Sequence, residues 1–98
     1  MQVDIAELSA ADFEPHVADS FRIATLSGAV ELKLVEVRRL GKALRKGDAF
    51  ALTFLSPPGP FLPQAIYPLD NAALGTLELF IVPLGPKDGG NSYEAVFT

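Results

Sequence analysis

The sequence predicts an all-β fold: a small antiparallel barrel, or a two-sheet sandwich, of about six strands with one short N-terminal helix. From Phe21 onward, apolar residues recur at every second position in short runs, which is the period of a half-buried strand. Glycine, proline, asparagine and aspartate separate these runs. A barrel is preferred because closure removes the exposed edges that apolar strands would otherwise present.

Length and composition predict a single domain over residues 1–98. Because 49% of the residues are apolar, the chain has the material for one core. It contains no cysteine, which excludes disulfides, thiolate nucleophiles and zinc sites built on Cys ligands. We therefore expect folding without a metal or a disulfide.

Charge and hydropathy exclude further classes of protein. No apolar stretch approaches the ~20 residues of a membrane helix, so no membrane partner is expected. Residues 1–7 show neither a basic region nor a long apolar run, which predicts a cytoplasmic protein without a secretory signal. The net charge of -4 makes nucleic acid an improbable partner, because that affinity normally needs a basic face.

One segment near the N-terminus has the pattern of a helix. Ser9 and Asp12 form a capping-box pattern, and Phe13 and Val17 share a face at i, i+4 spacing. Pro15 limits this helix to about two turns.

The first two strands are predicted to form a hairpin. Phe21, Ile23 and Thr25 share one face of the first strand, and Ser27-Gly28 provides a tight turn. In the second strand the apolar phase shifts after Leu34, from even to odd positions. Since a slip of one residue moves every side chain to the other face, we predict a β-bulge near Leu34-Val35.

The third and fourth strands flank a proline-rich loop. Phe50, Leu52 and Phe54 line one face of the third strand, and the run 56–60 is a surface loop because its prolines and glycine are incompatible with a strand interior. A fourth strand is expected around 64–69. Pro68 predicts that it lies at an edge or a bulge, before a turn at 70–71.

The last two strands are separated by a glycine-rich stretch. The fifth strand, 76–82, is apolar on both faces, as expected for a strand that is covered on both sides. A long turn over 85–90 then leads to a last strand over 93–97.

Catalytic, cofactor and metal sites are not predicted. His16 is the single histidine, and without Cys or a second His it completes no triad or recognisable metal cluster. Neither a phosphate-binding glycine motif nor a calcium-loop spacing of carboxylates occurs. We interpret His16 as a partly exposed helix residue.

Opposite charges are segregated along the chain. Five of the twelve acids lie in residues 1–19, and five of the eight bases, among them Arg38, Arg39 and Arg45, lie in residues 38–46. The basic run is interpreted as a solvated hairpin, as a contact for an anion or nucleic acid, or as a partner of the acidic segment. That pairing could form within one chain or between copies, where it would close a ring or extend a filament.

The proline-rich loop carries a second set of candidate interaction residues. Phe61 lies among prolines, followed by Gln64 and Tyr67. A rigid aromatic loop loses little entropy on binding, which favours a contact site. The alternative is that Phe61 and Leu62 fold back and cap an open end of the barrel.

The strings Gly59-Pro60-Phe61-Leu62-Pro63-Gln64, Ile66-Tyr67, Leu74-Gly75 and Leu77-Glu78-Leu79-Phe80 give the chain a resemblance to a known family. So do Val82-Pro83, Gly85-Pro86, the run 93–97, Asp12-Phe13-Glu14 and Leu34-Val35-Glu36-Val37. The chain resembles a small bacterial domain family of unknown function. The resemblance implies no activity or cofactor, and it implies an assembly role beside phage-tail-like proteins.

Two functional hypotheses follow. The first is a non-enzymatic protein-interaction or structural module that binds another protein or itself through the proline-rich loop and strand 77–82. The alternative is a small-molecule-binding barrel or an enzyme, with Tyr67, Tyr93, Glu36 and Arg38 converging at the barrel mouth. An interior filled by Phe50, Phe54, Leu79 and Phe97 would argue against the alternative.

Overall fold

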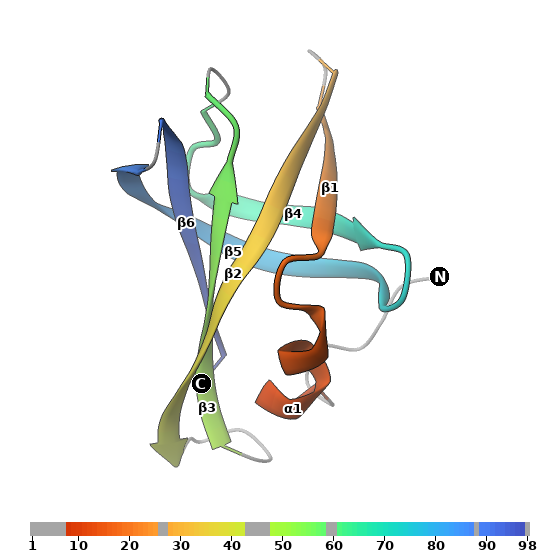
Figure 1. Ribbon diagram of the computed structural model, residues 1–98, viewed down its shortest axis with the longest axis vertical. Helices are drawn as coiled ribbons and strands as arrows, with labels where there is room; N and C mark the ends of the chain where they lie inside the picture. Colours follow the sequence, from red (N-terminus) through yellow and green to blue (C-terminus); the bar gives the residue numbers. More distant parts are fainter. Residues whose placement is uncertain (1–7, 26–27, 43–47, 59–60, 88, 98) are drawn as a thin grey trace.

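A computed structural model describes residues 8–25, 28–42, 48–58, 61–87 and 89–97. Two short helical turns precede six strands (Figure 1). The elements are α1 (Ala10–Phe13), the 3-10 turn η2 (Glu14–His16), β1 (Ser20–Thr25), β2 (Gly28–Lys42), β3 (Asp48–Ser56), β4 (Ala65–Asn71), β5 (Gly75–Lys87) and β6 (Gly90–Phe97).

The six strands form one antiparallel sheet that closes on itself in the order β1-β2-β3-β6-β5-β4. The predicted all-β class, the strand number and the N-terminal helix are confirmed, and the closed order agrees with the barrel form. Closure is narrow, because β1 and β4 share a single residue pair, Arg22 with Asp70. The β2–β3 and β3–β6 pairs are much longer.

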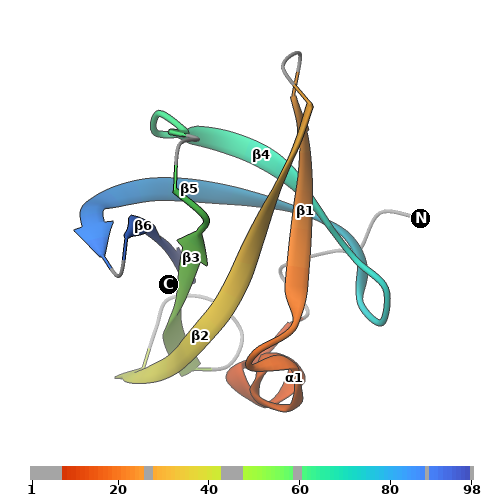
Figure 2. The ribbon, with the colours of Figure 1, turned by 45° about the horizontal axis from the view of Figure 1, so that its top comes forward.

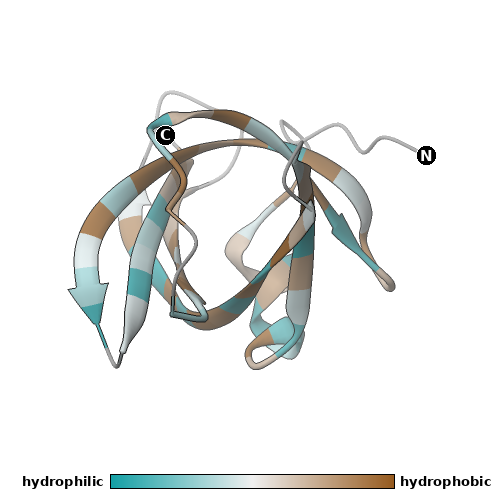
Figure 3. Cartoon of the chain, turned by 90° about the horizontal axis from the view of Figure 1, so that it is seen from above, coloured by the Kyte–Doolittle hydropathy of each residue, from teal (hydrophilic) through white to brown (hydrophobic). Residues whose placement is uncertain are grey.

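The interior of the ring is filled by side chains. Apolar and polar residues alternate along the strands (Figure 3), so each strand sends every second residue inward. The buried set includes the residues expected to fill a solid barrel: Phe50, Phe54, Leu79 and Phe97. A dense apolar core of this kind supplies the main driving force for folding.

The helical segment closes one end of the barrel. Phe13 is fully buried, and its ring centroid lies 5.7 Å from those of Phe50 and Phe97, which stack on each other at 4.4 Å. The predicted capping box is present: the Ser9 backbone N–H donates to the Asp12 carboxylate at 2.8 Å. This cap starts the helix where Phe13 can reach the core.

The helix is shorter than the two turns predicted. α1 has one turn, and Pro15 lies in η2, because proline has no N–H to continue the α-helical bonds. The backbone leaves helical geometry at Val17, whose side chain is 43% exposed. The prediction that Phe13 and Val17 share a helix face is therefore wrong, because Val17 lies outside the helical turns.

The predicted β-bulge is confirmed. Leu34 pairs with Phe54 and Glu36 with Thr53, so Val35 is the extra residue on β2. The insertion returns Val37 to the inner side, opposite Leu52, which explains the change of phase in the sequence.

Two strands are longer than the sequence predicted. β2 continues through the first half of the basic run to Lys42, because Arg38, Arg39 and Gly41 pair with β3. Arg45 lies outside the described residues. β5 likewise continues to Lys87, and at the register shift between Pro83 and Gly85 the extra residue is Leu84, since Gly85 pairs with Ser92.

Strand β5 does not have two covered faces. Its inner residues Leu77, Leu79 and Ile81 are at most 2% exposed, whereas Phe80 is 50% exposed. The prediction of cover on both sides is wrong, since no described element packs over the outer side of Phe80. An apolar outer face remains at the surface.

Candidate functional site

The largest exposed apolar side chains of the sheet meet on the outside of β4 and β5. Ile66 lies directly opposite Phe80 in the antiparallel register, and they are 67% and 50% exposed. Val82 follows Phe80 on the same side of β5 and is half-buried. We call Ile66, Pro68, Phe80 and Val82 the outer β4–β5 face.

Polar residues border the outer β4–β5 face. Next to it, Thr76 donates its hydroxyl to the Asp70 carboxylate at 2.5 Å, and Glu78 is exposed opposite Pro68. Cross-strand apolar neighbours such as Ile66 and Phe80 shield each other in part. The face therefore combines an apolar centre with a polar border, the usual composition of a protein-binding patch.

Of the two apolar residues in the proline-rich loop, Leu62 caps the barrel and Phe61 is exposed. Leu62 is buried, and its backbone N–H donates to the Tyr93 hydroxyl at 2.9 Å, so it caps the barrel end opposite α1. Phe61 is 62% exposed and remains available for contact. Gln64 is also exposed.

Tyr67 secures the far side of this loop. Its hydroxyl donates to the Pro63 carbonyl at 2.5 Å, and its ring packs against the core. Desolvation by burial, and to a lesser extent the nearby Tyr93, raise the pKa of Tyr67 above 10.0. The hydroxyl therefore stays protonated at neutral pH and acts as a hydrogen-bond donor.

The described arginines of the basic run form ion pairs with carboxylates of the same chain. Arg39 donates to both carboxylate oxygens of Glu14 at 3.1 and 3.0 Å, which ties β2 to the helical segment. Arg38 reaches Glu94 on β6 at 3.4 Å. The Arg39–Glu14 contact has the form of the intramolecular pairing considered from the sequence, whereas Arg38 pairs outside the acidic N-terminal segment. Both arginines remain more than half exposed.

The four residues expected at a barrel mouth do not converge. Tyr93 is fully buried and bonded to Leu62, and Tyr67 is turned to Pro63. Glu36 and Arg38 are exposed on the outside of β2. Together with the filled interior, this arrangement argues against a barrel-mouth site.

His16 is engaged locally. Its Nδ1 lies 2.8 Å from the Asp19 carboxylate, and the side chain is partly buried. Among the described residues, no three His, Cys, Asp or Glu side chains gather as a metal site would require. The part of the chain that the structure describes also contains no helix long and apolar enough to cross a membrane.

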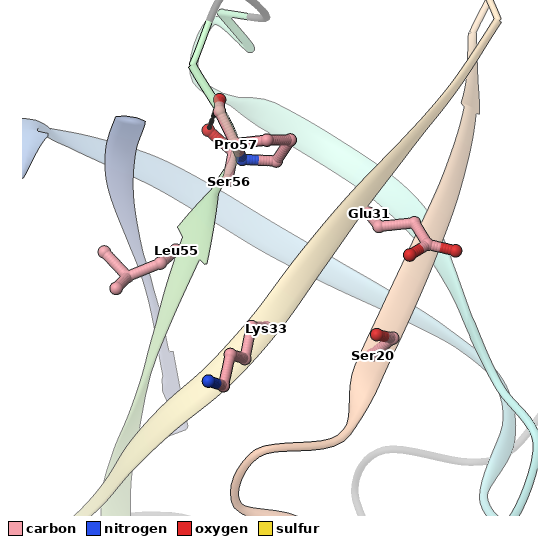
Figure 4. A pocket seen from close by; sticks show the side chains of 6 residues that line it. All are labelled: Ser20, Glu31, Lys33, Leu55, Ser56 and Pro57. Carbon is pink, nitrogen blue, oxygen red and sulfur yellow. Dashed lines mark hydrogen bonds between the residues drawn. The ribbon is translucent and has the colours of Figure 1, made fainter. Parts of the chain in front are cut away.

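Sequence reasoning missed two adjoining hollows on the outside of the β1–β2 hairpin, of about 310 and 390 Å³. The first is lined by Ser20, Glu31, Lys33, Leu55, Ser56 and Pro57 (Figure 4), and the second by Ser20, Arg22, Glu31, Asp70, Asn71 and Ala72. The signal for these hollows in the sequence was the tight turn of the β1–β2 hairpin. This turn sets the strand register, which places Ser20 opposite Lys33 and Arg22 opposite Glu31.

The fold and surface define the class of this protein as a small closed β-sheet domain with a filled interior and an apolar outer face. Residues 8–97 match the model of a family described as a domain of unknown function, DUF6916, and the chain belongs to that family. The resemblance to a small domain family of unknown function is thereby confirmed. No curated protein and no solved structure matches the chain.

Proposed function

We propose that this domain is a non-enzymatic protein-interaction or assembly module that docks through the outer β4–β5 face. The observation that carries the proposal is the exposure of Phe80 and Ile66 on the outside of a strand pair whose inner residues Leu69, Leu77, Leu79 and Ile81 are buried. Leaving this apolar surface in water gains nothing for folding, whereas covering it with a partner stabilises the complex by roughly 25 cal/mol per Å² buried.

The exposed Phe61 supports a second contact region. Proline residues on both sides restrict its backbone, and the Leu62 and Tyr67 hydrogen bonds hold the loop against the barrel. A loop ordered before binding loses little entropy on binding. Phe61 and Gln64 therefore provide a second, preorganised contact region besides the outer β4–β5 face.

For the wider setting we propose a bacterial, cytoplasmic protein that assembles beside phage-tail-like proteins. The family resemblance supports the assembly part of this proposal. An assembly module needs a stable scaffold and a surface patch rather than a catalytic cluster, and the filled interior suits that role.

Light scattering over a concentration series tests whether the partner is a second copy. Phe80→Ser removes the centre of the face, where Phe80 is 50% exposed, and Leu40→Ser, at a residue on β2 that is 44% exposed, is the matched control. We expect the mass of the wild type to rise with concentration and to persist in high salt, because apolar contacts are not screened.

Phe80→Ser should remain monomeric at concentrations where Leu40→Ser associates like the wild type. A wild type that stays monomeric throughout removes the self-association form and directs the search to a different partner protein. Equal loss of association in both variants would contradict docking through the outer β4–β5 face.

A further inference from the structure

The end of the β1–β2 hairpin pairs with neither of the neighbouring strands, β3 and β4. In Figures 1 and 2 it projects at one end of the molecule, apart from β3 and β4. The register agrees: β1 meets β4 at Arg22 alone, and β2 meets β3 from Lys33 onward. Residues 23–25 and 28–32 therefore pair only with each other within the described chain.

The direction of the backbone groups on β2 follows from two hydrogen bonds. The Leu34 N–H donates to the Asp19 carbonyl at 3.1 Å, and the Leu34 carbonyl accepts from Ala18 at 2.7 Å. The backbone N–H and carbonyl of Leu34 therefore point toward β1. Since the backbone groups of successive residues point to opposite edges of a strand, those of Ala29 and Glu31 point away from β1.

Ala29 and Glu31 face the side from which β3 has departed. No backbone hydrogen bond joins either residue to β3 or to Pro57 in the described chain. Two N–H groups and two carbonyls consequently form an open edge next to the smaller hollow. Unpaired edges of this kind accept an added strand.

The point where β3 separates from β2, beyond the Lys33–Leu55 pair, is fixed in position. Ser56 pairs with Asn91 on β6, and the Asn91 N–H donates to the Ser56 hydroxyl oxygen at 3.3 Å. A Cβ at Gly90 would overlap the Ser56 carbonyl, so this approach requires glycine. The end of β3 is held by β6 and cannot close over the β2 edge.

The charges that line the hollow are not balanced. Glu31 is bonded to Arg22 at 3.1 Å and extends over β1, whereas Lys33 projects from β2 (Figure 4). Among the described residues, no carboxylate pairs with the Lys33 ammonium. Leu55 and Pro57 add an apolar wall. The uncompensated charge here is positive.

The two open edges of the fold are protected differently. On β4, Pro68 lies next to the narrow closure with β1, where its missing N–H blunts the free edge. The hairpin from Ile23 to Val30 contains no proline and no charged residue. The β2 edge therefore keeps its backbone N–H groups, and its charged residues Glu31 and Lys33 restrict which segments can be added.

We propose that the β2 edge at Ala29 and Glu31 binds an extended segment of a partner protein as an added strand, with an acidic side chain of that segment against Lys33. Backbone bonds to the edge provide affinity, and Lys33, Leu55 and Pro57 select an acidic and apolar sequence. This interface is separate from the outer β4–β5 face and involves different residues.

The test is selection from a displayed library of random seven-residue segments on the purified domain, followed by titration of the enriched synthetic peptides. We expect Asp or Glu at one fixed position. Lys33→Glu should weaken binding about tenfold, which corresponds to one ion pair of 1.4 kcal/mol. Lys87→Glu, an exposed lysine on β5, should bind like the wild type.

Two further readouts keep the test independent of folding defects. Replacing the peptide's acid by lysine should restore binding to Lys33→Glu, and the amide hydrogens of Ala29 and Glu31 should exchange more slowly in the complex. The proposal is overturned if no peptide is enriched, if binding ignores the Lys33 charge, or if these amides stay unprotected. Dimerisation of the domain alone that Lys33→Glu abolishes would also overturn it, in favour of a second copy.

Discussion

Both faces of β5 carry large apolar residues, but the two faces differ in their surroundings. Leu77, Leu79 and Ile81 are enclosed by the other strands, whereas Phe80, between them in sequence, is half exposed. Period-two patterning places residues on alternate faces without stating which face is covered. The comparison shows that one face of β5 builds the core while the other remains available for a partner.

A buried charge should reveal this difference most strongly. Leu79→Asp places an unpaired carboxylate in the core, which costs several kcal/mol and is comparable with the whole stability of a small domain. Phe80→Asp leaves its carboxylate in water and should change the free energy of unfolding by about 0.5 kcal/mol. Urea unfolding followed by circular dichroism measures both. Equal losses in the two variants would show that the outer face is covered in the isolated domain.

A second pair of variants extends the comparison to two phenylalanines at the ends of the barrel. Phe13→Ala removes the fully buried plug against Phe50 and Phe97 and should destabilise the domain by about 3–5 kcal/mol. Phe61→Ala alters an exposed ring and should leave the unfolding midpoint nearly unchanged. A large loss for Phe61→Ala would mean that Phe61, like Leu62, caps the barrel.

Tyr93→Phe tests how the loop is attached to the core. The change keeps the ring and removes the hydroxyl that accepts from the buried Leu62 N–H. The unsatisfied N–H should cost about 1–3 kcal/mol. Hydrogen exchange should show faster exchange of the Leu62 amide, with amides of β1 and β2 unaffected. An unchanged Leu62 amide would contradict capping by this bond.

The smallest effect concerns Tyr67 at alkaline pH. Its folded pKa is raised above the unfolded value of 10.0, so its contribution to stability is complete below pH 10.0 and is lost as the pH rises through the folded pKa. Tyr67→Phe should therefore lose less stability above pH 10.0 than the wild type, measured as the fall in urea midpoint from neutral pH. Parallel falls in both proteins would contradict this contribution.

The sequence predicted the strand number, the core faces and the bulge, because each depends on local alternation of the kind shown by Phe50, Leu52 and Phe54. It did not predict that β2 extends through residues 38–42 of the basic run, since charged residues are equally compatible with a loop and with an exposed strand. The exposure of Phe80 depends on which elements cover the outer side of β5, and no local pattern encodes that information.

For the candidate sites, too, local features could be predicted from the sequence and tertiary features could not. Phe61 was identified because proline and aromatic residues adjoin in sequence, and its exposure agrees with that role. The β2 edge was not identified, because it arises where β3 departs toward β6, a tertiary event set in part by Gly90 and Ser56. The Arg39–Glu14 ion pair, by contrast, joins the two oppositely charged segments that the sequence had already suggested as partners.

Photo-cross-linking from position 80 tests the central claim most directly. A photoreactive phenylalanine analogue replaces Phe80 in one protein and Leu40, the exposed control on β2, in another. Irradiation of the purified domain and of a native extract should give one discrete adduct from position 80, a dimer of the chain or a single partner, and none from position 40. The absence of any discrete adduct from position 80, or the same adducts from both positions, would contradict an interaction module that docks through the outer β4–β5 face.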